Sequence, residues 1–231
     1  MADYAAPELL VDTAWLREHL TDPNIRVLEM AQDSSSFESG HIPGAALSPD
    51  WQIKGSENKR LVATPAEAKA WFESVGIGDD TLVIGYDRTR NRDAARLWWV
   101  LTYYGHTSVK VLNGGWEKWT LDGGPKEVGP SRVEAGETFT PAPANHDIES
   151  TVDKLTAAIG KPDVAIWDIR AADEFDGTNA RGNARAGHVP GAKHLEWVNL
   201  VNDDHTFKSA DELWALAGGI GITPETEVHV Y

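Results

Sequence analysis

The chain has 231 residues, of which 41% are hydrophobic and 25% charged, a balance typical of soluble globular proteins. This length exceeds what one ordinary domain needs, so two domains are expected. The 21 basic and 36 acidic residues give a formal net charge of −15, which disfavours nucleic acid as a partner. No apolar run is long enough to span a membrane, and the amino terminus lacks a basic stretch followed by an apolar core. A cytoplasmic protein without a membrane partner is therefore expected.

The sequence contains no cysteine. Disulfides and thiolate metal sites are therefore excluded within it. The eight histidines show no paired ligand spacing along one helix face, so we expect no metal site and no cofactor.

An internal repeat organises the chain. The sequence GHIPGA at Gly40–Ala45 recurs as GHVPGA at Gly187–Ala192. Downstream, Thr64–Glu67 and Ser209–Glu212 lie 145 residues apart (209 − 64) and share a hydroxyl residue followed three positions later by Glu. In this pattern the Thr or Ser and Glu side chains satisfy the free amides of a first helical turn. Each motif therefore predicts the start of a helix.

Short β-rich segments flank these motifs in both copies of the repeat. Thr81–Tyr86 and Thr226–Tyr231 follow the predicted helices, again 145 residues apart (226 − 81). Upstream of each turn, Arg26–Glu29 and Val164–Asp168 read as strands that end in an acid. The order strand, turn, helix, strand predicts a parallel sheet with helices on its faces.

The two copies differ in the spacing between the strand-end acid and the turn histidine. It is 12 residues from Glu29 to His41 (41 − 29) and 20 from Asp168 to His188 (188 − 168). The second copy therefore holds eight extra residues, around Asp176–Asn183.

The segment between the copies, residues 129–145, contains three prolines and little periodicity. It is expected to be an extended linker between an N-terminal domain, 1–128, and a C-terminal domain, 146–231.

Residues 87–122 of the first copy have no counterpart in the second. They hold a loop, an apolar helix at Ala94–Tyr104, a strand at Val109–Leu112 and a turn at Trp116–Trp119. The second domain is expected to be incomplete in this chain, with exposed core and an unpaired strand edge, so we expect the parent polypeptide to continue past Tyr231.

The ordered set of motifs resembles the rhodanese domain family. The resemblance rests on the GHIPGA and GHVPGA turns, the strand end Asp168–Arg170, and Leu112–Trp116 (LNGGW) followed by Trp119. The two-copy arrangement resembles the thiosulfate and 3-mercaptopyruvate sulfurtransferases. It implies an α/β fold of two rhodanese-like domains, each a small parallel sheet flanked by helices, with an intramolecular interface between the domains.

The resemblance also implies a chemistry and its place. In that family the second domain carries a nucleophilic cysteine directly after the strand that here ends at Tyr231, and the first domain usually carries Asp there, as at Asp87. In that family, backbone amides at a helix start lower the pKa of the cysteine thiol. The cysteine takes sulfur from thiosulfate or mercaptopyruvate to form a persulfide, and then passes the sulfur to cyanide or to an acceptor thiol. No catalytic residue then lies within this chain, and the 231 residues alone are expected to be inactive.

Supporting residues are expected around that loop. Asp168, Arg170 and His188 are candidates for arranging it. The competing interpretation is a structural ion pair for Asp168 and Arg170 and a turn-stabilising hydrogen bond for His188.

Two further groups of residues carry charge near the loops. Arg181 and Arg185, in the insertion of the second copy, are candidates for holding an anionic donor, against the alternative of a solvated loop. Glu174 occupies a position where some thiosulfate-using relatives have an arginine. Asp87, Arg88 and Arg90 are expected to form a vestigial loop.

Two other interpretations remain open. One is a catalytically inactive rhodanese-like module that binds or regulates, which Asp or Gly after Tyr231 would favour. The other is a phosphatase-like relative of the same fold, which would require a longer loop ending in arginine.

Overall fold

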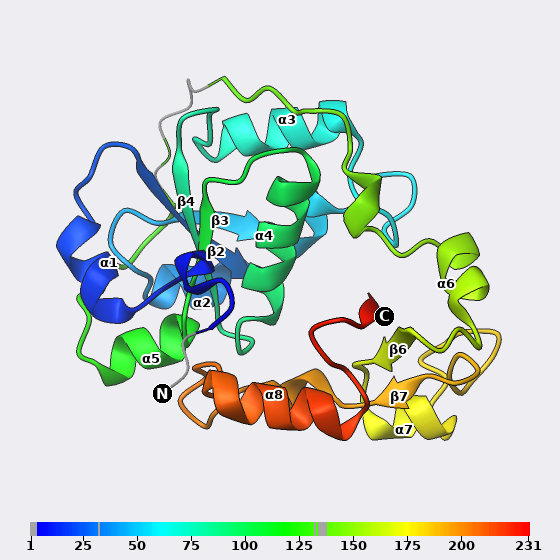
Figure 1. The fold of residues 1–231 in the computed structure, drawn as a ribbon. Helices are drawn as coiled ribbons and strands as arrows, with labels where there is room; N and C mark the ends of the chain where they lie inside the picture. The colour runs from blue at the N-terminus through cyan, green and yellow to red at the C-terminus, as the bar shows by residue number, and fades with distance from the viewer. Residues whose placement is uncertain (1–3, 32, 132, 134–137) are drawn as a thin grey trace. The chain divides into compact units, whose positions relative to one another are not determined.

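The computed structural model describes residues 4–31, 33–131, 133 and 138–231. Their contacts form two compact units. The N-terminal unit consists of residues 6–146 together with 203–206, and the C-terminal unit consists of the residues through Ala5, 147–202 and 207–231. Each unit is built on its own parallel sheet (Figure 1).

The N-terminal unit has a five-stranded sheet of order β1-β5-β4-β2-β3, in which all neighbours run parallel. Its strands are β1 (Leu10–Val11), β2 (Ile25–Ala31), β3 (Ala46–Pro49), β4 (Leu82–Asp87) and β5 (Val109–Leu112). Its helices are α1 (Thr13–His19), α2 (Ser34–Ser39), α3 (Pro65–Ser74), α4 (Arg92–Tyr103) and α5 (Gly115–Leu121), with 3₁₀ turns at Pro7–Leu9 and Asp50–Ile53. Parallel neighbours need such crossover connections, which explains the predicted alternation of strands and helices.

Both faces of this sheet are covered. The adjacent β2 residues Val27 and Leu28 belong to different apolar clusters, because successive strand residues point to opposite faces. One cluster contains residues of α3 and α4, and the other contains residues of α1, α2 and α5 (Figure 1).

The C-terminal unit has a three-stranded parallel sheet of order β7-β6-β8. Its strands are β6 (Val164–Asp168), β7 (Lys193–His194) and β8 (Glu227–Val230). Its helices are α6 (Val152–Ala158), α7 (Ala172–Asp176) and α8 (Ala210–Gly219), and 3₁₀ turns lie at His146–Ile148 and Trp197–Leu200. Within the described residues β8 is an edge strand, whereas its counterpart β4 lies between β2 and β5.

The apolar face of α8 is also less covered than that of its counterpart in the first copy, α3. In the first copy, α3 buries Trp71 and Phe72 in a cluster with Leu97 and Leu101 of α4. The α8 positions that match Trp71 and Phe72, Leu216 and Ala217, are only partly buried. The second copy has no counterpart of α4 among the described residues, which leaves this face partly open.

Both predicted capping boxes are present. The Thr64 and Ser209 side chains accept hydrogen bonds from the amides of Glu67 and Glu212, whose carboxylates accept from Thr64 and Ser209 in return. Hydrogen bonds from Ser56 and Thr64 lower the pKa of Glu67 to about 2.

The segment expected to be a linker, residues 129–145, packs against the N-terminal unit. Phe139 is 1% exposed, and its ring centroid lies 4.7 Å from that of Phe72. The amides of Ala142 and Asn145 donate to carbonyls at the end of α4, at 2.9 and 2.8 Å. An aromatic anchor and backbone hydrogen bonds thus hold a proline-containing segment without regular structure, and the contact boundary falls after His146. Residues 132 and 134–137 lie outside the described part of the chain.

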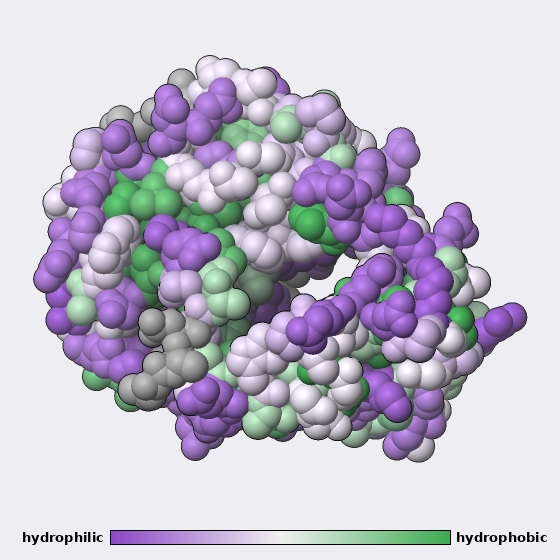
Figure 2. Space-filling model, in the orientation of Figure 1, coloured by the Kyte–Doolittle hydropathy of each residue, from purple (hydrophilic) through white to green (hydrophobic). Residues whose placement is uncertain are grey.

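The surface is largely polar, as the charge balance predicts. Figure 2 shows a face covered mainly by hydrophilic and intermediate residues, with apolar residues in small patches. None of the helices in the described ranges combines the length and apolarity needed to cross a membrane.

We expect Phe139→Ala to lower the free energy of unfolding of the N-terminal unit by about 3 kcal/mol, the usual cost of emptying a buried aromatic site. Hydrogen exchange of the β4 amides measures this loss. Val128→Ala is the matched control, because Val128 is 71% exposed. Equal exchange in the two variants would mean that the segment contributes no packing energy.

Candidate functional site

The candidate site lies at the carboxyl ends of the sheet strands, the edge where open α/β sheets bind ligands. In the N-terminal unit this edge is formed by the ends of β2 and β4 and by the loop that leads from β4 into α4. In the C-terminal unit the corresponding ends are those of β6 and β8, and Tyr231 follows β8 directly.

The loop after β4 surrounds a single carboxylate. Asp87 Oδ1 accepts hydrogen bonds from the amides of Thr89 and Asn91, both at 2.9 Å. Its Oδ2 accepts from the amides of Asp93 and Ala94, both at 2.8 Å. We call these four N–H groups the amide cradle. The cradle stabilises negative charge at the start of α4, where the helix dipole acts in the same direction.

Burial opposes the cradle. Asp87 is 1% exposed, and desolvation raises the pKa of its carboxyl group, while the hydrogen bonds from Ala94, Thr89 and Asn91 act in the lowering direction. The loop turns through Arg90 and Asn91, whose φ angles of 61° and 68° lie in the left-handed region. Of the predicted vestigial residues, Asp87 thus fills the cradle, and Arg90 is exposed beside it.

The third predicted residue of that loop, Arg88, belongs to a buried polar cluster. Its Nε donates to Glu29 Oε1 at 2.7 Å, and its Nη2 donates to the Gly40 carbonyl at 2.5 Å. The Tyr86 hydroxyl donates to Glu29 Oε2 at 2.5 Å and accepts from the Ile42 amide at 3.2 Å. We call Glu29, Tyr86 and Arg88 the first clasp, because they tie the ends of β2 and β4 to the GHIPGA turn. Burial and the Glu29 charge raise the pKa of Tyr86 well above its ordinary value.

The C-terminal unit contains an equivalent cluster, the second clasp of Asp168, Arg170 and Tyr231. Arg170 Nε and Nη2 donate to the Asp168 carboxylate at 3.0 and 2.5 Å, and Nη2 also donates to the Gly187 carbonyl at 3.0 Å. The Tyr231 hydroxyl accepts from the Val189 amide at 2.9 Å and hydrogen-bonds with Asp168.

The charges of the second clasp stabilise one another. Burial acts to raise the pKa of Asp168, but the hydrogen bonds from Arg170 and Tyr231 outweigh it and lower that pKa. The bond to Asp168 raises the pKa of Arg170. The sequence-predicted pair of Asp168 and Arg170 is therefore a bidentate ion pair in the structure.

The two clasps agree in detail although their arginines come from different strands. Both carboxylate side chains are fully buried, and the arginine side chains are 27% exposed at Arg88 and 28% exposed at Arg170. Each guanidinium bonds the strand-end acid and the carbonyl of the turn glycine. Arg88 follows β4, whereas Arg170 follows β6.

The turn histidines make the same bond in both copies. His41 Nδ1 lies 2.9 Å from the Phe37 carbonyl, and His188 Nδ1 lies 2.7 Å from that of Phe175. Each imidazole stacks on the same phenylalanine, with centroids 3.8 and 3.9 Å apart. His41 is buried and its backbone forms a β-bridge with Glu127, while His188 is exposed. A hydrogen bond of this kind matches the turn-stabilising interpretation.

The predicted donor-binding arginines lie in the insertion and differ in their contacts. Arg181 is 65% exposed at its side chain and pairs with Glu174 of α7, with Nε 3.1 Å from Oε2. Arg185 is exposed. The carboxylate that departs from the family's arginine pattern thus holds one of the two candidate arginines.

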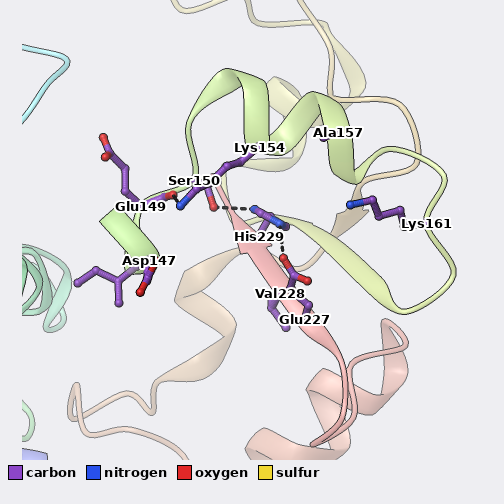
Figure 3. Close-up of a pocket in the computed structure, with 10 residues that line it drawn as sticks. Asp147, Glu149, Ser150, Lys154, Ala157, Lys161, Glu227, Val228 and His229 are labelled. Atoms are coloured by element: carbon purple, nitrogen blue, oxygen red, sulfur yellow. Dashed lines mark hydrogen bonds and ion pairs between the residues drawn. The ribbon is translucent and has the colours of Figure 1, made fainter. Parts of the chain in front are cut away.

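A hollow of about 460 Å³ lies elsewhere in the C-terminal unit (Figure 3). At its wall, Ser150 Oγ lies 2.9 Å from His229 Nδ1, and His229 Nε2 lies 3.1 Å from Glu227 Oε1. By the 145-residue offset, His229 matches Ile84 of β4, a core residue of the first copy. Ser150 lies two residues before α6, as Val11 at the end of β1 lies two residues before α1, so these two positions match. The hollow therefore lies where the first copy holds β5 between β1 and β4.

Several residues around the clasps are not singled out by the sequence pattern. Tyr86 and Tyr231 were recognised only as strand ends, although their recurrence at the same offset was a usable signal. Arg88 was assigned to a vestigial loop, because its equivalence to Arg170 appears only in three dimensions. Trp116, whose ring lies 4.3 Å from the Arg88 guanidinium carbon, gave no separate signal.

We expect the thiol of an Asp87→Cys variant to have a pKa below the ordinary value of about 8.5. The amide cradle stabilises the thiolate, and a large thiolate loses less hydration energy on burial than a carboxylate does. The chain contains no other thiol, so thiolate absorbance against pH measures this pKa, with Asp87→Ser as the control. A pKa at or above the ordinary value would show that burial outweighs the amides.

Comparisons with known proteins agree with this architecture. The family profile of the Rhodanese-like domain matches residues 12–122 and 151–231. The sulfur carrier protein TtuD of Thermus thermophilus is 37% identical over 99% of this chain and 83% of its own length. A putative thiosulfate sulfurtransferase of Mycolicibacterium smegmatis is 33% identical over 98% of this chain and 83% of its own length.

Solved structures show the same fold. SseA of Escherichia coli, described as a 3-mercaptopyruvate sulfotransferase, superposes with a TM-score of 0.84 at 28% identity, covering 96% of this chain and 87% of SseA. YnjE superposes with a TM-score of 0.89 at 26% identity over the whole of this chain, which spans 60% of YnjE. With two matching segments that cover most of its length, the chain belongs to the rhodanese-like domain family.

Proposed function

We propose that this chain forms the larger part of a sulfurtransferase whose nucleophile is a cysteine directly after Tyr231. The observation that carries the proposal is the equivalence of the two clasps. In the first copy, the residue after the clasp tyrosine is Asp87, and it lies in the amide cradle. The Tyr231 hydroxyl bonds the Val189 amide and Asp168, as the Tyr86 hydroxyl bonds the Ile42 amide and Glu29, so the next residue would enter the matching loop.

The family assignment supports this chemistry. Relatives that align with nearly the whole chain are named as sulfurtransferases or as a sulfur carrier. These relatives are longer than this chain, so we propose activity for a polypeptide that continues past Tyr231. The 231 residues alone are proposed to be inactive. The active polypeptide is proposed to act in the cytoplasm.

The proposed cycle has two steps. The cysteine thiolate attacks the outer sulfur of thiosulfate, a sulfur–sulfur bond forms to give the persulfide, and the bond to the sulfonate group breaks to release sulfite. Cyanide or a thiolate then attacks the terminal sulfur, which leaves as thiocyanate or a new persulfide and regenerates the thiolate. Amide donors at the loop would stabilise the anion in both forms.

The donor is proposed to be thiosulfate, with 3-mercaptopyruvate as the alternative. Either is a small anion, and the net charge of −15 disfavours its approach unless local cations reverse the field. The exposed Arg181 and Arg185 are the proposed cations, with Arg181 exchanging the Glu174 carboxylate for the donor.

We expect the chain extended by its natural residues after Tyr231 to take up one sulfur atom from thiosulfate and to form thiocyanate from cyanide. The 231-residue chain, which has no thiol, should do neither. Intact mass and a thiocyanate assay measure the two steps, with both proteins checked for folding by circular dichroism. A residue other than cysteine after Tyr231, or a folded extended chain that transfers no sulfur from either donor, refutes the proposal.

In the extended chain we expect Arg181→Ala and Arg185→Ala each to raise KM for thiosulfate by roughly 3- to 10-fold with little change in kcat, because each removes a cation that binds the donor. Glu174→Gln should lower KM, since it releases Arg181 from its carboxylate partner. Lys161→Ala, at the hollow, is the control. If KM is unchanged in both arginine variants, the arginines belong to a solvated loop.

A further inference from the structure

Asn91 is placed to cap α4 but does not do so. Asparagine at the N-cap commonly accepts a hydrogen bond from an amide of the first helical turn. Here the Asn91 side chain makes no such bond, and Asp87 takes the amides of Asp93 and Ala94 instead. Asn91 is nevertheless 1% exposed. A buried side-chain amide that the helix does not use must be satisfied by other partners.

Those partners come from two other segments of the N-terminal unit. Asn91 Oδ1 accepts from the Gly114 amide at 3.2 Å, and Asn91 Nδ2 donates to the His205 carbonyl at 2.7 Å. The side chain therefore joins the loop after β4, the turn before α5 and residues 203–206, which come from the second half of the sequence.

The glycine pair of the LNGGW motif makes this approach possible. Gly114 has a φ of +88°, and a Cβ there would lie 2.4 Å from the Lys118 Cβ and 3.1 Å from the Thr206 Cγ2. Gly115 has a φ of +53°, and its Cβ would lie 2.4 Å from the Asp87 carbonyl oxygen. Side chains at either position would push the three segments apart. The proposed sulfur chemistry assigns no role to this pair.

The segment 203–206 has a shape that suits the contact. The Asp204 carboxylate accepts from the amide and the hydroxyl of Thr206, at 3.1 and 2.6 Å, which closes a tight turn. His205 has a φ of 67°, and its carbonyl accepts the Asn91 bond. The charge of Lys118 also stabilises the Asp204 carboxylate and helps to lower its pKa, after the larger effect of the Thr206 hydroxyl.

We infer that the loop 87–92 and the Gly114–Gly115 turn form a socket that binds the tip 203–206, with Asn91 as its positioning residue. The first-copy loop therefore has a binding role in this protein in addition to holding Asp87. Its occupant is a segment of the same chain, recognised through its backbone carbonyl at His205. The inference stands whether or not sulfur transfer occurs.

The test compares hydrogen exchange of the amides of residues 203–206 in Asn91→Ala and in the unchanged chain. Loss of one buried hydrogen bond should speed their exchange roughly 5- to 10-fold. Asn91→Asp should give the same increase, because a carboxylate can accept from Gly114 but cannot donate to His205, and the first-turn amides of α4 remain bound to Asp87. Asn199→Ala is the matched control, since its amide donates to the Glu196 carbonyl within its own exposed turn.

The β4 and α4 amides serve as the internal reference for folding of the unit. Faster exchange confined to 203–206 in both Asn91 variants supports the socket. Unchanged exchange at 203–206 in Asn91→Asp, with β4 and α4 still protected, overturns it. Trypsin cleavage after Lys208 gives a second readout, which should accelerate in the same two variants and not in Asn199→Ala.

Discussion

The fold around each candidate loop depends on one fully buried carboxylate at the end of a central strand. A carboxylate without solvent is costly unless both of its oxygens accept hydrogen bonds and a counter-charge is near. Glu29 and Asp168 meet both conditions through an arginine and a tyrosine, and each arginine also binds the turn glycine. Removing the arginine would leave a buried charge uncompensated, and removing the tyrosine would take away one of the hydrogen bonds to that charge. The need to pair and hydrogen-bond this carboxylate therefore holds three parts of each unit together: the strand that carries the acid, the tyrosine that leads into the loop, and the GHxPGA turn.

The loop of the first copy is closed by its own residues. The Asp87 carboxylate accepts hydrogen bonds from all four amides of the cradle, so no other anion can bind them. Arg88 is bound to Glu29 and Gly40, and Asn91 bonds Gly114 and His205. The backbone of this loop thus presents four N–H groups to one anion, and each polar side chain named here has a structural partner.

Local sequence patterns predict much of the fold. The two capping boxes, the paired strands and the acid before each turn follow from side-chain chemistry within a few residues, and the structure contains them all. The position of residues 129–145 was not accessible in this way. Prolines predict an irregular segment but not that Phe139 fills a site beside Phe72. Likewise, the repeat predicted equivalent loops, but only the folded chain shows that Arg88 and Arg170 reach the same carbonyl from different strands.

The different origin of the two arginines has a consequence for the loop that follows each tyrosine. In the first copy Arg88 supplies the guanidinium from the loop after β4, because β2 continues to Ala31 and has no cation at the place that matches Arg170. In the second copy Arg170 supplies the guanidinium from the end of β6, and the His194 ring bonds its carbonyl at 2.8 Å. No residue beyond Tyr231 is then needed to complete the second clasp. The second clasp is thus complete within the described residues, whereas the first clasp depends on Arg88 of the loop that follows β4.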